Sequence, residues 1–209
     1  MVRYASWRVY FRSFPLRTRL LFLGMFLYLA CFTLISYFSG NNEFFFYAIV
    51  FFSFFIFIVS YYHKLRLTNW LLALLAFHWL LHFLGGFVYI GGTRLYDFWL
   101  IGHFFKYDNV VHTFGVFLGT FIIYNLLRPH FKLLNKMALF HFSVLLVLVV
   151  MGLGALAEIG ELIAVLFFHA AQTVGGYLNN AFDLVWNLLG GTLACLVIGR
   201  YEARRLKKK

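Results

Sequence analysis

The sequence predicts an all-α, polytopic membrane protein, a six-transmembrane-helix bundle in a single domain over residues 1–209. Hydrophobic residues make up 63% of the chain and charged residues only 12%, a composition that soluble domains of this size do not show. Six apolar segments also reach or approach the roughly 20 residues that a helix needs to cross a hydrocarbon core of about 30 Å. They lie at about residues 20–38, 44–62, 70–90, 109–127, 139–167 and 182–199.

The placement of the basic residues predicts how these helices are oriented. Of the 18 Lys and Arg residues, only Arg94 and Lys106 fall on one side of the predicted membrane. The others lie in the N-terminal arm, the second and fourth loops and the C-terminal tail (residues 3–19, 64–66, 128–136 and 200–209). By the positive-inside rule, both termini are cytoplasmic and the protein belongs in the inner (plasma) membrane. Topology and contact of the basic termini with anionic lipid explain the net charge of +11, so we expect no nucleic-acid partner.

Three acidic residues, Glu158, Glu161 and Asp183, interrupt the last two apolar segments. A carboxylate inside a bilayer costs from about 3 to more than 10 kcal/mol, so such residues normally face the bundle interior and have a partner. Glu158 and Glu161 are three residues apart and share a helix face, where they repel unless a cation, a proton or a histidine lies between them. Asp183 forms a polar stripe with Asn180 and Asn187 at spacings of i, i+3 and i+7.

The expected partners lie upstream of these acids. Asp108 and His112 are four residues apart at the start of the fourth span and therefore share a face. Taken alone, this pair also fits a helix N-cap followed by an interfacial histidine. His78 and His82 are likewise one turn apart in the third span, and a membrane histidine often only hydrogen-bonds across a helix interface. Of these two, His82 is the candidate ligand, because His78 falls near mid-membrane.

Depth along each helix brings these side chains into one layer. Counted from the cytoplasmic ends, His112 lies about 24 Å, Glu158 about 26 Å and His82 about 20 Å into the membrane, at 1.5 Å per residue. Asp183 begins its span at the outer side. The sequence therefore predicts one polar site near the outer face, built from three or four helices.

Two further patterns predict how helices pack near this layer and how the longest outer loop lies. Glycines at positions 152, 154 and 160 predict that a neighbouring helix packs closely on the fifth span, and Gly190 and Gly191 predict the same for the sixth. The long outer loop, TRLYDFWLIGHFFKYD, has the composition of an amphipathic lid lying along the interface.

Four segments in order, HWLLHFLGGFVYIGG, KYDNVVHTFG, AEIGEL and NNAFDLVWNLLGG, resemble the YjdF-type bacterial inner membrane proteins and, more distantly, the VanZ-like membrane proteins. The resemblance covers roughly residues 70–200 and depends on the combination of D-x-x-x-H, E-x-x-E and D-x-x-x-N. YjdF-type chains tend to carry more aspartates in the last helix, where this chain has Asn180 and Asn187. The resemblance implies a shared membrane core with a polar layer, and its VanZ-like side implies an association with glycopeptide-antibiotic tolerance.

Three functions fit this layer, and the sequence leaves all three open. The first is a metal-dependent hydrolase or transferase acting on a lipid or lipid-linked envelope substrate. Zn, Mn or Mg would be held by His112, Glu158, Asp183 and His82, with Glu161 as general base, Asp108 orienting the imidazole, and Asn180 and Asn187 in support. The second is a proton- or cation-coupled transporter. The third is a non-catalytic envelope factor whose polar layer only joins helices. The substrate and the oligomeric state are not predicted.

Overall fold

The computed structural model describes residues 7–131, 136–170 and 176–206. Within these ranges six helices are long and apolar enough to cross a membrane, which confirms the predicted fold class. They are α2 (Leu16–Phe38), α3 (Asn42–Leu65), α4 (Asn69–Phe87), α5 (Tyr107–Leu127), α6 (Lys136–Phe168) and α7 (Tyr177–Leu206). A short helix, α1 (Trp7–Arg12), precedes them, and a 3-10 turn, Arg128–His130, follows α5.

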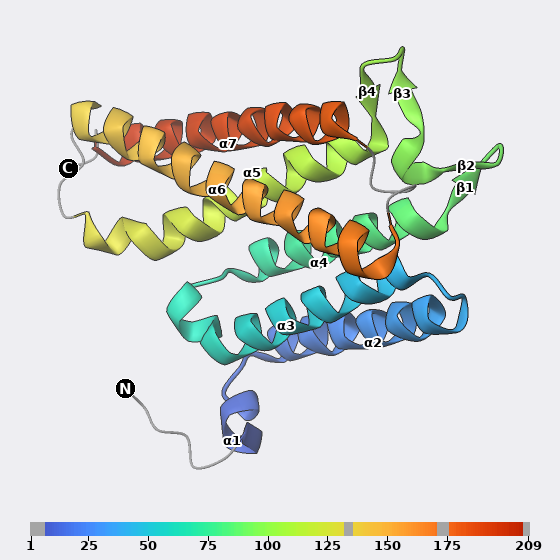
Figure 1. Ribbon diagram of the computed structural model, residues 1–209. Coiled ribbons are helices and arrows are strands. Elements are labelled where there is room, and N and C mark those ends of the chain that lie inside the picture. The colour runs from blue at the N-terminus through green and yellow to red at the C-terminus, as the bar shows by residue number, and fades with distance from the viewer. Residues whose placement is uncertain (1–6, 132–135, 171–175, 207–209) are drawn as a thin grey trace.

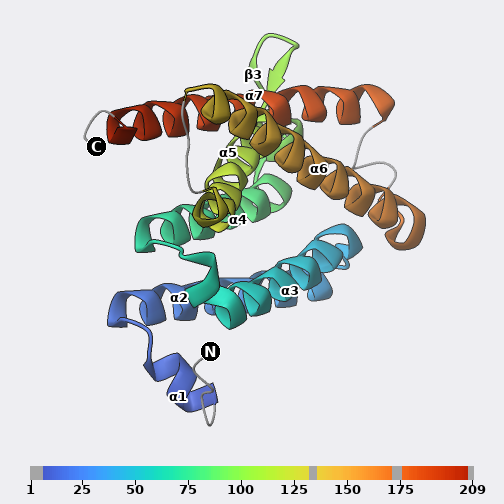
Figure 2. The same ribbon diagram turned by 90° about the vertical axis from the view of Figure 1, so that its left-hand side faces the viewer.

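The six long helices run alternately in opposite directions, so their connections gather at two ends of the bundle (Figure 1). α5 packs most extensively against α7, and α6 lies obliquely across both. α2 and α3 pair with each other on the far side of α4 (Figure 2). α5 therefore lies at the centre of the bundle, where it meets α4, α6 and α7.

The two ends differ in charge. We call the end with the α4–α5 connection the hairpin end, and the end where α4 starts and α7 finishes the basic end. Arg17, Lys64, Arg66, Arg128 and Arg204 lie at the basic end, in agreement with the grouping expected from the sequence. The predicted charges at residues 3, 132 and 207–209 lie outside the described residues.

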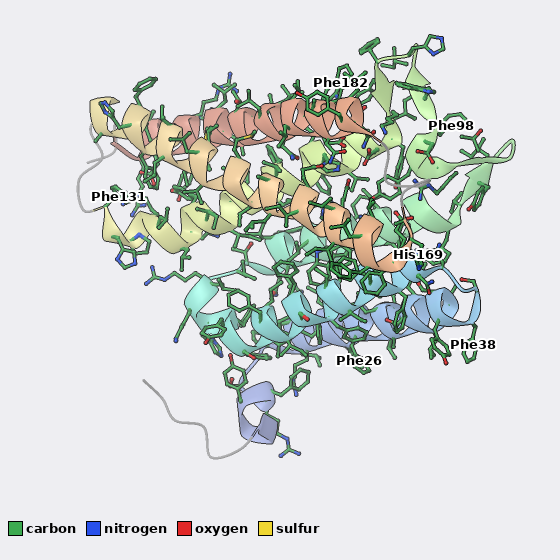
Figure 3. The ribbon with its side chains drawn as sticks, viewed as in Figure 1. Phe26, Phe38, Phe98, Phe131, His169 and Phe182 are labelled. Carbon is green, nitrogen blue, oxygen red and sulfur yellow. The ribbon has the colours of Figure 1, made fainter. Side chains whose placement is uncertain are left out.

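Large apolar side chains cover the outside of the bundle as well as its core. Phe83 on α4 is completely buried, whereas Phe26 on α2 and Phe182 on α7 are about half exposed and point away from the bundle on opposite sides (Figure 3). A water-soluble protein does not tolerate so large an apolar surface, but helices in lipid require one.

The connection between α4 and α5 differs from the amphipathic lid expected from its sequence. α4 ends at Phe87, and two short hairpins follow, formed by β1 (Tyr89–Ile90) with β2 (Thr93–Arg94) and by β3 (Trp99–Ile101) with β4 (Phe105–Lys106). A 3-10 turn, Leu95–Asp97, separates them. Gly91 and Gly92 both have positive φ, 57° and 84°, which is the conformation that a two-residue hairpin turn requires. The β3–β4 hairpin projects crosswise to the helices, beyond α7 (Figures 1 and 2).

Close packing of α5 on α7 depends on a glycine, as predicted. A Cβ added at Gly190 would clash with the backbone of Thr113, so only glycine permits this approach. The hydroxyl of Thr113 also donates to the backbone carbonyl of Trp186, at 3.3 Å. This contact joins the second turn of α5 to the third and fourth turns of α7.

The predicted small-residue face of α6 is only partly used. A Cβ added at Gly154 would lie 2.7 Å from Nδ2 of Asn187, whereas Gly152 and Gly160 have open space around them. The prediction of close helix packing is therefore correct at Gly154 and wrong at the other two glycines.

Candidate functional site

Asp108 faces the interior of the bundle from the first turn of α5. It does not cap the helix, since the backbone N–H of Lys106 donates to Oδ1 of Asn109 at 2.8 Å and Lys106 itself is the N-cap residue. Instead, Oδ1 of Asp108 lies 3.4 Å from Nε2 of His112, and its Oδ2 lies 3.1 Å from Nζ of Lys106. The alternative interpretation of Asp108 as a helix cap is therefore wrong.

His112 lies at the centre of the site. Its Nδ1 is 3.3 Å from Oδ1 of Asn187 on α7 and 3.9 Å from Oε1 of Glu158 on α6. Its Nε2 faces Asp108, and it also lies 4.0 Å from Oε1 of Glu161. Both ring nitrogens therefore face oxygen acceptors contributed by three helices.

Asp183 enters the same site from α7 and is completely buried. Its Oδ2 accepts a hydrogen bond from Nδ2 of Asn179 at 2.7 Å, and its Oδ1 lies 3.4 Å from Nδ2 of Asn109. Two amides thus hold the carboxylate in place. Both were missed at the sequence level, although Asn109 directly follows Asp108.

The polar stripe on α7 has a different register from the predicted one. Asn179, Asp183 and Asn187 follow at spacings of four residues, and all three contact the site. Asn180 contributes its backbone N–H to the carbonyl of Gly176, at 3.3 Å, but no side-chain hydrogen bond within the described residues. A spacing of four keeps side chains on one helix face as well as a spacing of three does, so periodicity alone could not choose between the two asparagines.

Lys106 is part of the site rather than an isolated outer charge. Besides its ion pair with Asp108, its Nζ donates to Oδ1 of Asn179. It therefore links β4 and the start of α5 to the first turn of α7. In the sequence, the position of Lys106 two residues before Asp108 could have indicated this role.

Glu158 and Glu161 approach His112 from α6. Their side chains are 11% and 19% exposed. Both carboxylate oxygens of Glu158 and Oε2 of Glu161 are buried without a hydrogen-bond partner among the residues described. With Asp108 and Asp183, the site holds four carboxylates in contact with one lysine and one histidine. Unless protons or a metal ion are bound, three negative charges remain, and the bilayer makes these costly.

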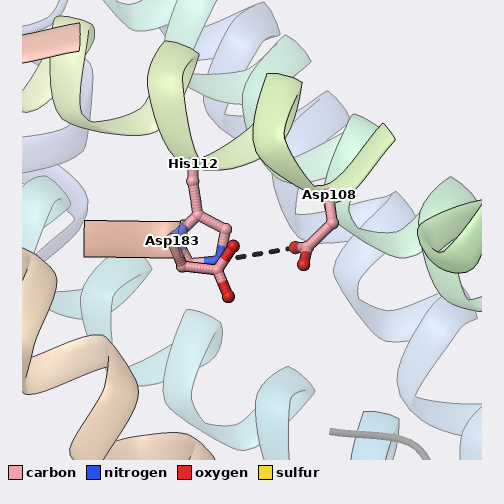
Figure 4. Close-up of side chains that lie close together, drawn as sticks. All are labelled: Asp108, His112 and Asp183. Carbon is pink, nitrogen blue, oxygen red and sulfur yellow. Dashed lines mark ion pairs between the residues drawn. The ribbon is translucent and has the colours of Figure 1, made fainter. Parts of the chain in front are cut away.

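Three of these residues could hold one ion. Asp108, His112 and Asp183 each offer one ligand atom, and these atoms lie within 4.8 Å of one another (Figure 4). Ligand atoms about 2.0–2.2 Å from a common ion can be up to roughly 4.4 Å apart. The observed spacing therefore needs only a small side-chain adjustment to bind a metal.

The two histidines of α4 are held elsewhere. His82 hydrogen-bonds through Nδ1 to the hydroxyl of Tyr96, and its ring packs against Phe44 and Phe51. Burial raises the pKa of Tyr96 well above its usual range, so the phenol stays protonated. His82 is not a member of the three-residue group, and its role as a ligand stays a prediction. His78 packs against Gly115 on α5, one turn beyond His112.

An ion pair that the sequence did not suggest fixes the first hairpin beside the site. Nη1 of Arg94 lies 3.2 Å from Oε2 of Glu43 at the start of α3, and its Nε lies 2.9 Å from Oδ2 of Asp97. Burial opposes the charge on Arg94, but Glu43 and Asp97 outweigh it and raise the pKa of the guanidinium. The first hairpin and the 3-10 turn after it are therefore attached to α3 as well as to α4 and α5.

Comparisons with known proteins place the chain in a family without assigning an activity. A search of curated proteins and a search of solved structures each found no match to this chain. A family model described as "Predicted membrane protein (DUF2238)" matches residues 18–204, which include all six long helices apart from their extreme ends. This is the family of the YjdF-like proteins, so the resemblance to YjdF-type chains is confirmed. The protein belongs to the DUF2238 family of predicted membrane proteins.

Proposed function

We propose that the protein is a metal-dependent hydrolase or transferase that acts on a lipid or a lipid-linked envelope substrate. The observation that carries the proposal is the convergence of Asp108, His112 and Asp183 beside two glutamates, three of whose oxygens are buried without a hydrogen-bond partner among the described residues. A site that served only to join helices would satisfy its buried carboxylates, because each unsatisfied one costs free energy.

The donors present suit a borderline or hard divalent cation such as Zn, Mn or Mg. Nδ1 of His112 can donate its hydrogen to Asn187, which leaves the Nε2 lone pair facing Asp108 and available to a metal. Asp183 is held by Asn109 and Asn179 with capacity to accept one further bond. These contacts fix the ligands before an ion arrives.

A divalent ion there would polarise a phosphoryl or carbonyl oxygen of the substrate and lower the pKa of a water molecule. Glu161, whose Oε2 has no hydrogen-bond partner among the described residues, is placed to accept the proton of that water. Glu158 lies on the same face of α6, where it can complete the ligand set. The ammonium of Lys106 lies at the site, beside Asp108. From there it can stabilise negative charge on the leaving group.

The position of the site suggests the substrate class. It lies at the hairpin end of α5, α6 and α7 (Figure 1), opposite the basic end. If the basic end faces the cytoplasm, as the positive-inside rule predicts, the site opens near the outer face of the inner membrane. The headgroups of lipids and of lipid-linked cell-wall intermediates are found at this depth. The proposed envelope role also draws on the more distant resemblance of the sequence to VanZ-like membrane proteins.

Elemental analysis of the protein in mild detergent tests the metal. We expect close to one equivalent of a divalent metal in the wild type and a loss of most of it in His112→Ala and Asp183→Asn. Asp97→Asn is the matched control, because Asp97 is an exposed acid on the hairpin side and its metal content should be unchanged. Absence of metal from wild-type protein reloaded with Zn, Mn and Mg would refute the metal site.

Turnover is tested separately with a bacterial envelope lipid extract as substrate. Glu161→Gln should keep its metal and lose activity by at least about 100-fold, the typical contribution of a general base. Full activity in this variant would exclude Glu161 as the base.

Proton- or cation-coupled transport is the second candidate, favoured by the unpartnered oxygens of Glu158 and Glu161 near His112 in the described part of the chain. The position of the site at one end of the bundle, away from the middle, weighs against it. Ion flux into liposomes that contain the protein, lost in Glu158→Gln, would favour transport over hydrolysis.

A further inference from the structure

A second feature of the molecule lies at the basic end. It is far from the acidic site, by which we mean the cluster of Asp108, His112, Glu158, Glu161 and Asp183. A groove of about 600 Å³ runs between α2 and α4. Its walls are apolar and include Leu20, Leu21, Met25 and Ala76. At its mouth lie Arg17, Asn69 and Trp70. None of the residues that line it is acidic.

The groove runs along the two helices and is closed at its inner end. The hydroxyl of Tyr28 on α2 donates to the backbone carbonyl of Ala76 on α4, at 3.1 Å, and this bond closes its inner end. Arg17 and Tyr28 are eleven residues apart on α2, which corresponds to about 16 Å along the helix. Gly24 lies between them, and a Cβ added there would meet no atom within 4 Å. The middle of the groove is therefore open because this residue has no side chain.

The mouth of the groove favours an anion. The guanidinium of Arg17 is exposed. Oδ1 of Asn69 already accepts a hydrogen bond from Thr18, at 2.7 Å, so the amide nitrogen is the group that Asn69 can offer to an acceptor. α2 and α4 both begin here (Figure 1), and the positive ends of their helix dipoles point toward the mouth. Trp70 is 79% exposed, as expected for an aromatic side chain at a membrane interface.

We infer that this groove binds an acidic phospholipid, with the phosphate at Arg17 and Asn69 and one acyl chain between α2 and α4. A cationic mouth above an apolar groove of this length matches a lipid better than it matches a free anion or a peptide. Anionic lipids gather at membrane surfaces next to basic residues, at about 1 kcal/mol per charge. The inference does not depend on the proposed function, because the groove shares no residue with the acidic site.

Native mass spectrometry of the full chain in a neutral detergent tests this inference. The protein is incubated with phosphatidylglycerol or with phosphatidylcholine, and the lipid retained per chain is counted. We expect one retained phosphatidylglycerol and a preference of about fivefold over phosphatidylcholine, the equivalent of about 1 kcal/mol for one arginine. Arg17→Gln should abolish the preference.

Filling the groove supplies the sharper test. Gly24→Leu should lower retention of both lipids, because the added side chain occupies the path of the acyl chain. Gly152→Leu is the matched control, since Gly152 on α6 also has open space around it and lies away from the groove. Equal losses in the two variants, or equal retention of the two lipids by the wild type, would mean non-specific lipid only and overturn the inference.

Two further measurements distinguish a lipid groove from a plain anion site and from the acidic site. Inorganic phosphate at millimolar concentration should not displace the lipid, and complete displacement would indicate a plain anion site and contradict the inference. His112→Ala should retain phosphatidylglycerol as the wild type does. Failure of the lipid test therefore leaves the metal proposal intact, and failure of the metal test leaves the lipid site intact.

Discussion

The bundle buries carboxylates at both of its ends, and two of them, Glu202 on α7 and Glu158 on α6, differ in their partners. At the basic end, Glu202 is completely buried and accepts hydrogen bonds from the hydroxyl of Tyr124 and from Nε of Arg128, the latter at 2.6 Å. At the hairpin end, Glu158 is nearly as buried, yet neither of its oxygens has a hydrogen-bond partner within the described ranges. Glu202, with its partners in place, joins two helices, whereas Glu158 keeps the capacity to bind a proton or an ion. Burial alone therefore does not identify a functional carboxylate, and a missing hydrogen-bond partner is a second criterion that separates Glu158 from Glu202.

The largest effect is expected from breaking the satisfied acid. Glu202→Ala leaves the guanidinium of Arg128 and the hydroxyl of Tyr124 without their common acceptor. Removing one member of a buried ion pair typically costs 3–5 kcal/mol, and we expect about 3 kcal/mol because Arg128 can partly hydrate. Unfolding in mild detergent measures this loss, and Glu158→Ala is the control that should show no comparable loss. A smaller loss in Glu202→Ala than in Glu158→Ala would reverse the comparison.

Metal binding should stabilise the hairpin end and leave the basic end unchanged. A divalent ion at a hundredfold excess over its Kd stabilises the folded protein by about 2.7 kcal/mol. We expect this increase in thermal stability in the wild type and its absence in Asp183→Asn. Glu202→Gln should keep the increase, although it starts from a lower stability. A metal-induced increase of equal size in Asp183→Asn would place the ion elsewhere.

In metal-free protein at neutral pH, Glu158→Gln should raise stability by about 1 kcal/mol. The substitution removes one of four neighbouring carboxylates and keeps the shape of the side chain, so the site has one fewer buried acid that must either repel its neighbours or hold a proton. Glu202→Gln should have the opposite sign, because it weakens an ion pair. Thermal unfolding of both variants in a chelator checks the two signs, and the same sign for both would mean that their partners do not distinguish them.

Much of this architecture could be predicted from the sequence, because the bilayer imposes length and apolarity on every spanning helix. The gathering of Asp108, His112, Glu158, Glu161 and Asp183 followed from helix rise and face. Contacts outside that periodicity could not be predicted. The hairpins have strands of two or three residues, too short for an alternating pattern to show.

Glu202 was missed for a related reason. The last span was expected to end at residue 199, which placed this acid in a solvated tail. α7 continues to Leu206, and the pairing of Glu202 with Arg128 depends on the crossing of α5 and α7. Residues 74 positions apart in the chain carry no local signal of their contact.

The smallest effect tests the register of the polar stripe on α7. The test compares two adjacent asparagines, Asn179 and Asn180. Asn179→Ala removes hydrogen bonds to Asp183 and Lys106, whereas Asn180→Ala removes no described side-chain bond. Polar contacts within membranes average about 0.6 kcal/mol each, so Asn179→Ala should cost about 1 kcal/mol and Asn180→Ala less than about 0.5 kcal/mol. Metal affinity should follow the same order, because Asn179 positions Asp183 and Asn180 does not. If Asn180→Ala instead weakened both stability and metal binding more than Asn179→Ala, the stripe would follow the spacing first expected from the sequence. Asp183 would then have a different orientation in the acidic site.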